Sequence, residues 1–167
     1  MIVGILDYGM GNIRSIYNAI EKLDFTPKII TNNFKSVDKL IIPGVGAFPD
    51  AMSSLKNSGA LDEILEFNAS EKYILGICLG MQLLFESSEE ISSSSGIKLI
   101  SGSVKKFPCH LKTPQIQWNK LVHKGKSCIY DNNTNDDFFY FLHSYYAKST
   151  HDFDHKSISE YNGFEFL

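Results

Sequence analysis

Three short apolar runs, each ended by a glycine-rich turn, constrain the fold of this chain more than any other feature. They are IVGIL at residues 2–6, KLII at 39–42 and YILGI at 73–77. Continuous apolar runs of this length are typical of strands that are buried on both faces of a parallel sheet. Segments with helical character follow each run. The pattern therefore predicts an α/β fold around a mostly parallel central sheet.

The expected order in this half is strand, helix, strand, strand, helix, strand, helix. A second strand, KIIT, opens after Pro27, and residues 48–57 and 60–69 are predicted helices. The segment MQLLF after Gly80 begins a further helix. The first helix begins near Ile13, and its apolar stripe has helical spacing: Ile13, Ile16, Tyr17, Ile20 and Leu23.

The character of the sequence changes after residue 86. The serine-rich segment SSEEISSSSG, residues 87–96, predicts a mobile surface loop. The short segments after it have strand and turn signals and should form an antiparallel half: IKLI, SVKKF, QIQWNKLV, SCIY, FFYFLHSYY and SISEY. Because no linker or internal repeat divides the chain, we expect a single domain over residues 1–167.

Composition argues against several classes of function. The 167 residues carry a formal net charge of -3 and scattered lysines, which does not favour nucleic-acid binding. No apolar run approaches the ~20 residues of a membrane-spanning helix, and the start MIVGILDYG lacks the basic region of a signal peptide. Three cysteines without scaffold spacing indicate free thiols and a cytoplasmic location. No cysteine or histidine pair has zinc-site spacing, so we expect no metal.

The segment GICLG, residues 76–80, is the strongest candidate for chemistry. Ligands of open α/β sheets bind beyond the carboxyl ends of the strands, where Cys78 lies. A nucleophile on a sharp turn between strand and helix has an exposed side chain, and small neighbours such as Gly76 and Gly80 let the backbone turn. The start of the helix beside the sulfur lowers a thiol pKa. We interpret Cys78 as a nucleophile; the alternative is a buried structural cysteine.

Two further glycine-rich loops follow strands at the same edge. In PGVGAF, the glycines around Val45 allow peptide N–H groups to face a ligand, as an oxyanion hole requires; an ordinary tight turn is the alternative. DYGMGN has the first two glycines of a dinucleotide-binding loop, but Arg14 stands where that fingerprint has its third. We therefore expect neither NAD nor FAD, and interpret Asn12 as the cap of the first helix.

His143, in FLHSYY, is a candidate base for Cys78. A neutral imidazole beside a thiol can accept its proton. In so aromatic a strand, however, a packed and hydrogen-bonded histidine is the more common situation. The residues alone leave both interpretations open.

Five motifs, in this order, resemble those of class I glutamine amidotransferases: DYGMGNIRS, IIPGVGAFPDAM, GICLGMQLLFESSEE, WNKL and YFLHSYY. The resemblance covers essentially the whole chain. More narrowly, PGVGAF combined with CLGMQLLFE is similar to the glutaminase subunits of imidazole glycerol phosphate synthase, from histidine biosynthesis. The resemblance implies a three-layer, flavodoxin-like α/β fold with a mostly parallel central sheet and an antiparallel C-terminal half.

The resemblance also implies roles for individual residues. Cys78 attacks the side-chain amide of glutamine, forms a glutamyl thioester and releases ammonia, and water then frees glutamate. Glu90 holds the α-amino group of glutamine, and His143 is structural. The oxyanion hole and the other substrate contacts are implied to be Gly44, Val45, Gly46, the Leu79 N–H, Gln82, Ser144 and Tyr145.

The implied partner is a (β/α)8-barrel cyclase subunit in a heterodimer, and no cofactor is implied. Ammonia passes through a tunnel to this subunit and is joined there to a phosphorylated ribulosyl nucleotide intermediate. The glutaminase is implied to be slow until the partner binds its own ligand. The residues on partner-facing segments are implied to be Tyr8, Gly9, Met10, Gly11, Asn12, Trp118 and Asn119.

Two departures from the family pattern bear on these roles. Gln115 and Gln117 stand where the family usually has a histidine and a glycine before Trp-Asn, so an ammonia-supplying glutaminase for amidation of a surface sugar is an alternative. The His-Pro-Glu sequence that supplies the family's base is not among the 167 residues. A 167-residue form would bury its sheet poorly. We therefore expect these residues to be a longer protein without its C-terminal part.

Two other functions remain as alternatives. If the protein is truly this short, a catalytically inactive subunit that only docks a barrel partner is one of them. A cysteine peptidase would share the sharp turn at Cys78. It has less support, because Gln82 and Glu90 match a small amino-acid substrate better.

Overall fold

The computed structural model describes residues 1–91, 93–125, 138–151 and 156–166. The chain forms two compact units, Met1–Ile100 and Ser101–Leu167, and each is described by itself below. The predicted site residues are divided between these units.

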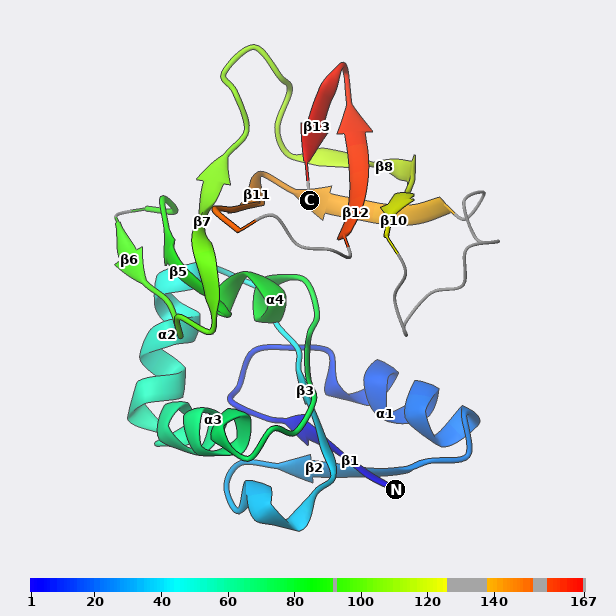
Figure 1. The fold of residues 1–167 in the computed structure, drawn as a ribbon, viewed down its shortest axis with the longest axis vertical. Coiled ribbons are helices and arrows are strands. Elements are labelled where there is room, and N and C mark those ends of the chain that lie inside the picture. The colour runs from blue at the N-terminus through cyan, green and yellow to red at the C-terminus, as the bar shows by residue number, and fades with distance from the viewer. Residues whose placement is uncertain (92, 126–137, 152–155, 167) are drawn as a thin grey trace. The chain divides into compact units, whose positions relative to one another are not determined.

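The N-terminal unit is built on a four-stranded parallel sheet with the strand order β2-β1-β3-β4 (Figure 1). Its strands are β1 (Ile2–Leu6), β2 (Thr26–Ile30), β3 (Lys39–Ile42) and β4 (Ile74–Gly76). Its helices are α1 (Ile13–Lys22), α2 (Phe48–Asn57), α3 (Ala60–Ala69) and α4 (Leu79–Leu83), with a 3-10 turn η1 (Phe34–Ser36). The parallel sheet and its alternation with helices confirm the predicted fold class.

Helix α1 packs on the sheet through the predicted stripe. Ile13, Ile16 and Tyr17 lie against an apolar cluster that includes Val3, Ile5, Ile20 and Ile41. The Asn12 side chain accepts a hydrogen bond from the Ser15 N–H at 3.2 Å, which confirms the predicted cap. Leu23, however, lies one residue beyond the helix and is exposed, so its place in the stripe was wrong.

Residues 79–96 fold differently from the prediction. Helix α4 ends at Leu83, and Phe85 begins strand β5 (Phe85–Ser88), which pairs antiparallel with β6 (Ser94–Ser95). The serine-rich segment therefore contains paired strands, and the prediction of a mobile loop was wrong for these residues. Ser88 is buried, and its hydroxyl accepts from the Glu90 N–H at 3.1 Å. Composition indicated a loop because serine is common in loops, whereas burial and strand pairing depend on tertiary neighbours.

The C-terminal unit is antiparallel, as predicted. Strand β12 pairs with β9 and β13, β10 pairs with β8, and β11 pairs with β7 (Figure 1). The segment SCIY lies outside the described residues, and of IKLI only Ile100 is in a strand, so that predicted strand was wrong. The strands of this half are β7 (Ile100–Lys106), β8 (Gln115–Lys120), β9 (Val122–Lys124), β10 (Phe138–His143), β11 (Tyr145–Ser149), β12 (Lys156–Tyr161) and β13 (Phe164–Phe166).

An aromatic cluster around Phe107 forms the core of this unit. The Phe107 ring lies 5.4 Å from the ring of Phe166 and 5.9 Å from that of Tyr161, both edge to face. Such pairs contribute about 1 kcal/mol each beyond the area that they bury. The cluster therefore links strands that are far apart in the sequence.

In the part of the chain that the structure describes, no helix is long and apolar enough to cross a membrane.

Candidate active site

Cys78 lies in the turn between β4 and α4 with an unusual backbone conformation. Its φ is 54° and its ψ is -116°, and its side chain is exposed. A non-glycine residue with positive φ costs about 1–3 kcal/mol, and such conformations cluster at functional sites. The sequence predicted a nucleophile on a sharp strand-to-helix turn, and this is the backbone that such a turn requires.

The glycines on either side of Cys78 are required by close packing. A Cβ at Gly80 would lie 1.9 Å from the Ile42 carbonyl oxygen, and one at Gly76 would lie 2.5 Å from the Met81 Cα. Both neighbours are backbone atoms, which cannot move aside as a flexible side chain can. The turn therefore presents Cys78 at the surface only because these two positions lack side chains.

The PGVG loop, residues 43–46, packs directly against this turn. A Cβ at Gly44 would lie 2.7 Å from the Gly80 nitrogen and 2.8 Å from the Leu79 Cβ. Val45 and Gly46 are exposed, and Gly46 has a φ of +112°. Leu79 is the first residue of α4, so its N–H has no acceptor within that helix. The structure thus brings the predicted oxyanion loop and the Leu79 amide together beside Cys78.

Two residues predicted to bind substrate, Gln82 and Glu90, also belong to the N-terminal unit. The Gln82 N–H, on α4, donates to the Cys78 carbonyl at 3.1 Å. The Glu90 carboxylate accepts from the Phe48 N–H at 2.7 Å, at the first residue of α2. A carboxylate at a helix start is favoured by the helix dipole. Glu90 is therefore held where the PGVG loop runs into α2.

The first glycine-rich loop, residues 7–12, also belongs to this arrangement. Tyr8 is buried, and its hydroxyl donates to the Pro43 carbonyl at 2.7 Å. Burial raises the pKa of Tyr8 far above its ordinary value, and the charge of Cys78 raises this pKa further. Tyr8 was predicted only as part of a partner-facing segment, and its inward contacts had no signal in the sequence. The other four residues that this first segment contributes to the partner-facing prediction are half-buried or exposed: Gly9, Met10, Gly11 and Asn12.

The remaining predicted site residues belong to the C-terminal unit. Ser144 lies between β10 and β11 and accepts from the Phe107 N–H through its carbonyl at 3.1 Å, and Tyr145 begins β11. Trp118 is exposed, and its ring lies 5.6 Å from that of Tyr140. Asn119, by contrast, is buried, and its side-chain amide donates to the Glu160 carbonyl. Asn119 therefore faces into its own unit, whereas Trp118 faces solvent.

His143 is packed among aromatic rings, in agreement with the structural interpretation. Its Nδ1–H donates to the Tyr145 carbonyl at 2.8 Å, and its ring lies 5.1 Å from that of Phe107. Burial lowers the pKa of His143, partly offset by the hydrogen bond to Tyr145, so the imidazole is neutral over a wider pH range. Gln115 is the direct cross-strand neighbour of His143 and is fully buried.

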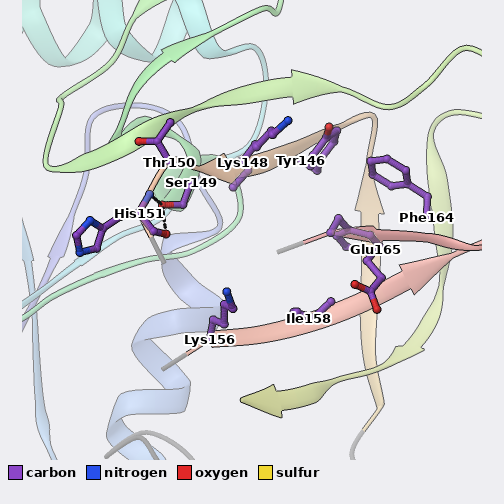
Figure 2. A pocket seen from close by; sticks show the side chains of 11 residues that line it. Tyr146, Lys148, Ser149, Thr150, His151, Lys156, Ile158, Phe164 and Glu165 are labelled. Carbon is purple, nitrogen blue, oxygen red and sulfur yellow. Dashed lines mark hydrogen bonds between the residues drawn. The ribbon is translucent and has the colours of Figure 1, made fainter. Parts of the chain in front are cut away.

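A cavity also lies in the C-terminal unit. It has a volume of about 510 Å³ and is lined by residues of β11, β12 and β13 and the turn after β11 (Figure 2). None of the predicted site residues lines it. Across the described ranges, no group of three histidine, cysteine or acidic side chains is arranged to hold a metal ion.

Comparison with known proteins gives the family. The family model "Glutamine amidotransferase class-I" matches residues 4–165. The imidazole glycerol phosphate synthase subunit HisH of Sulfurimonas denitrificans is 46% identical over 154 residues, which is 87% of this chain and 73% of that protein. The HisH subunit of Bacillus cereus is 39% identical over 163 residues, which is 96% of this chain and 77% of that protein.

Solved structures agree on the fold. A crystal structure of a glutamine amidotransferase matches with a TM-score of 0.69 at 15% identity and covers 89% of this chain and 74% of its own. The structure of PurLQS from Thermotoga maritima matches with a TM-score of 0.70 at 17% identity, over 97% of this chain and 76% of that one. With both the family model and these close relatives in agreement, the chain belongs to the class I glutamine amidotransferases and, among them, to the HisH subunits of imidazole glycerol phosphate synthase.

Proposed function

We propose that this chain hydrolyses glutamine through a thioester on Cys78 and supplies the ammonia to a synthase partner. The observation that carries the proposal is the turn at Cys78, where an exposed thiol in a strained backbone lies beside the PGVG loop. Family membership supports glutamine as the substrate, and the geometry supports Cys78 as the residue that attacks it.

The chemistry follows from the groups around the sulfur. The thiolate attacks the carbon of the glutamine side-chain amide, and the carbonyl oxygen becomes an oxyanion that the amides of residues 44–46 and Leu79 stabilise. The C–N bond then breaks, the nitrogen gains a proton and leaves as ammonia. Water attacks the thioester, the C–S bond breaks, and glutamate and the thiolate are released.

The proton acceptor for the Cys78 thiol is not a histidine of the N-terminal unit. Residues 1–100 contain no histidine, and none of the five histidines of this sequence precedes Pro-Glu. The Tyr8 hydroxyl, whose pKa is raised by burial and by the charge of Cys78, stays neutral and donates a hydrogen bond to the Pro43 carbonyl. Tyr8 is therefore not the base that accepts the thiol proton.

We further propose a (β/α)8-barrel cyclase as the partner and a cytoplasmic location. HisH relatives are subunits of a synthase by name, which supports a partner that uses the ammonia. The imidazole glycerol phosphate product would then be made on the partner, in histidine biosynthesis. The free thiols of Cys78 and Cys109 agree with a reducing compartment.

Substitution of Cys78 and, as a control, of Cys109 provides the test. In Cys78→Ala we expect glutamine hydrolysis by the complete protein to fall at least 10³-fold, because the covalent route is lost. The matched control is Cys109→Ala, which removes a second exposed free thiol of the described residues and should leave the rate unchanged. Glutamate production is the measurement, with the site of labelling by a glutamine-like chloroketone read by mass spectrometry.

Two results would overturn the proposal. Hydrolysis that survives in Cys78→Ala would remove the assigned nucleophile. A wild-type protein that releases no glutamate and takes up no chloroketone on Cys78 would instead support a subunit that only docks a partner.

A further inference from the structure

We propose that Tyr8 is a positioning residue, whose buried hydroxyl holds the PGVG loop in place beside Cys78. This inference rests on the proposed function, since it assigns a task within the same site. The family resemblance placed Tyr8 only on a partner-facing segment and gave it no role in the site.

The hydroxyl of Tyr8 lies where the elements of the site meet. It donates to the Pro43 carbonyl at 2.7 Å, and it would be 2.9 Å from a Cβ at Gly44. The same Gly44 position is in close contact with the Gly80 nitrogen. One buried hydroxyl therefore touches the first two residues of the oxyanion loop, which in turn pack on the turn that carries Cys78.

Tyr8 is fixed at both of its ends. The Ser54 hydroxyl, on α2, donates to the backbone carbonyl of Tyr8, while the phenol reaches Pro43. The neighbouring Gly11 packs on the same proline, since a Cβ there would lie 2.9 Å from the Pro43 Cβ. Residues Tyr8 and Gly11 of the first loop therefore both contact Pro43 of the PGVG loop.

This bond fixes the peptide that begins the oxyanion loop. Rotating the Pro43–Gly44 peptide would turn the Pro43 carbonyl away from Tyr8 and leave a buried hydroxyl without its acceptor, which is unfavourable. The amides of Gly44, Val45 and Gly46 follow directly along the chain, so their directions depend on that peptide. An oxyanion hole works only if its donors are oriented before the charge develops.

Tyr8 keeps its proton under all conditions in which the enzyme would work. Its pKa is raised by burial and by the charge of Cys78, so the phenol remains a donor while the thiolate forms. The hydroxyl consequently holds the loop in both protonation states of Cys78.

The experiment compares two reagents that both alkylate the sulfur of Cys78. The chloroketone L-2-amino-4-oxo-5-chloropentanoic acid resembles glutamine, so we expect the oxyanion loop to bind its ketone oxygen and speed its reaction. Iodoacetamide lacks the glutamine-like part and alkylates a thiolate by direct displacement, so we expect its reaction not to depend on that loop. In Tyr8→Phe, we expect the maximal rate of chloroketone labelling of Cys78 to fall about 10-fold, between the effects of losing one hydrogen bond and a whole oxyanion donor. The chloroketone concentration that gives half of the maximal labelling rate should change less than about twofold, because the residues that bind the glutamine-like part remain.

The other readouts separate positioning from a general loss of structure. Iodoacetamide labelling should have the same rate and pH dependence as in the wild type, and amide hydrogen exchange should rise at residues 44–46. Ser54→Ala should change chloroketone labelling in the same direction. Tyr17→Phe, which removes a hydroxyl from α1, is the matched control and should match the wild type in all measurements.

The outcomes are distinct. Wild-type chloroketone and exchange rates in Tyr8→Phe would overturn the positioning role and leave the proposed function intact. A parallel fall in both labelling rates would also overturn it, because the effect would then be on the thiol or the fold. Failure of the wild type to label with chloroketone would overturn the proposed function, and this inference with it.

Discussion

At the scale of single residues, Glu90 is expected to have two roles, one structural and one in substrate binding, and substitutions can distinguish them. Its carboxylate accepts from the Phe48 N–H at the start of α2, which is a structural role. The family resemblance also gives it the α-amino group of glutamine, which is a substrate-binding role. The first task needs an oxygen atom, whereas the second needs a negative charge.

Glu90→Gln keeps an acceptor oxygen and removes the charge. We expect the KM for glutamine to rise at least 10-fold, because a hydrogen bond between charged groups contributes about 1.5–3 kcal/mol. The midpoint of urea unfolding should change little. Glu90→Ala should also lose about 1 kcal/mol of unfolding free energy, as removal of a helix cap does. Glu21→Gln, on the exposed face of α1, is the control, and an unchanged KM in Glu90→Gln would exclude the substrate role.

At the scale of elements, the pair of strands β8 and β10 has one apolar face that is open to solvent. The register places Ile116 opposite Leu142 and Trp118 opposite Tyr140, and all four side chains are more than half exposed. Contiguous exposed apolar side chains of this kind mark interaction surfaces. Trp118 was predicted on a partner-facing segment, and this face is where we expect that contact.

Trp118 is the only tryptophan of the chain, so it reports on this face directly. We expect its fluorescence to shift to shorter wavelength when the cyclase subunit binds, because the indole leaves water. Trp118→Ala should weaken the complex at least 10-fold, as loss of a central aromatic contact does. Tyr73→Ala, which removes an exposed aromatic residue next to β4, should bind as the wild type does. An unchanged spectrum in a formed complex would place the interface elsewhere.

At the scale of the whole molecule, activity should depend on the partner. The segment expected to face the partner contacts the oxyanion loop, since a Cβ at Gly46 would lie 2.7 Å from the Met10 Cε. Val45 and Gly46 are exposed, whereas Pro43 and Gly44 are buried, so a partner can reach the second half of the loop. A partner that binds one loop conformation more tightly shifts the population toward it.

We therefore expect weak glutamine hydrolysis by the isolated chain and a rise of at least 10-fold when the cyclase subunit and its nucleotide ligand are added. Glutamate production with the chain alone, with the partner, and with partner and ligand together is the measurement. The ligand added without the partner is the control. Full activity of the isolated chain would show that the oxyanion loop needs no partner.

The sequence by itself determined the alternation of strands and helices, the parallel sheet and the sharp turn at Cys78. They depend on local patterns, because apolar runs, helical spacing and glycines near one cysteine are visible within a few residues of one another. The Asn12 cap belongs to the same class, since the residues that it joins are three positions apart. The antiparallel second half followed from its short segments and turns.

Only the tertiary structure decided that Ser88 is buried in a strand, that Tyr8 holds Pro43 and that Asn119 faces inward. Tyr8 and Pro43 are 35 positions apart, and Asn119 and Glu160 are 41 positions apart. No local pattern records such pairs, because the hydrogen-bond partner of a buried polar side chain can come from a distant part of the chain. For the same reason, the cysteine could be recognised from its neighbours, while the residue that positions its oxyanion loop could not.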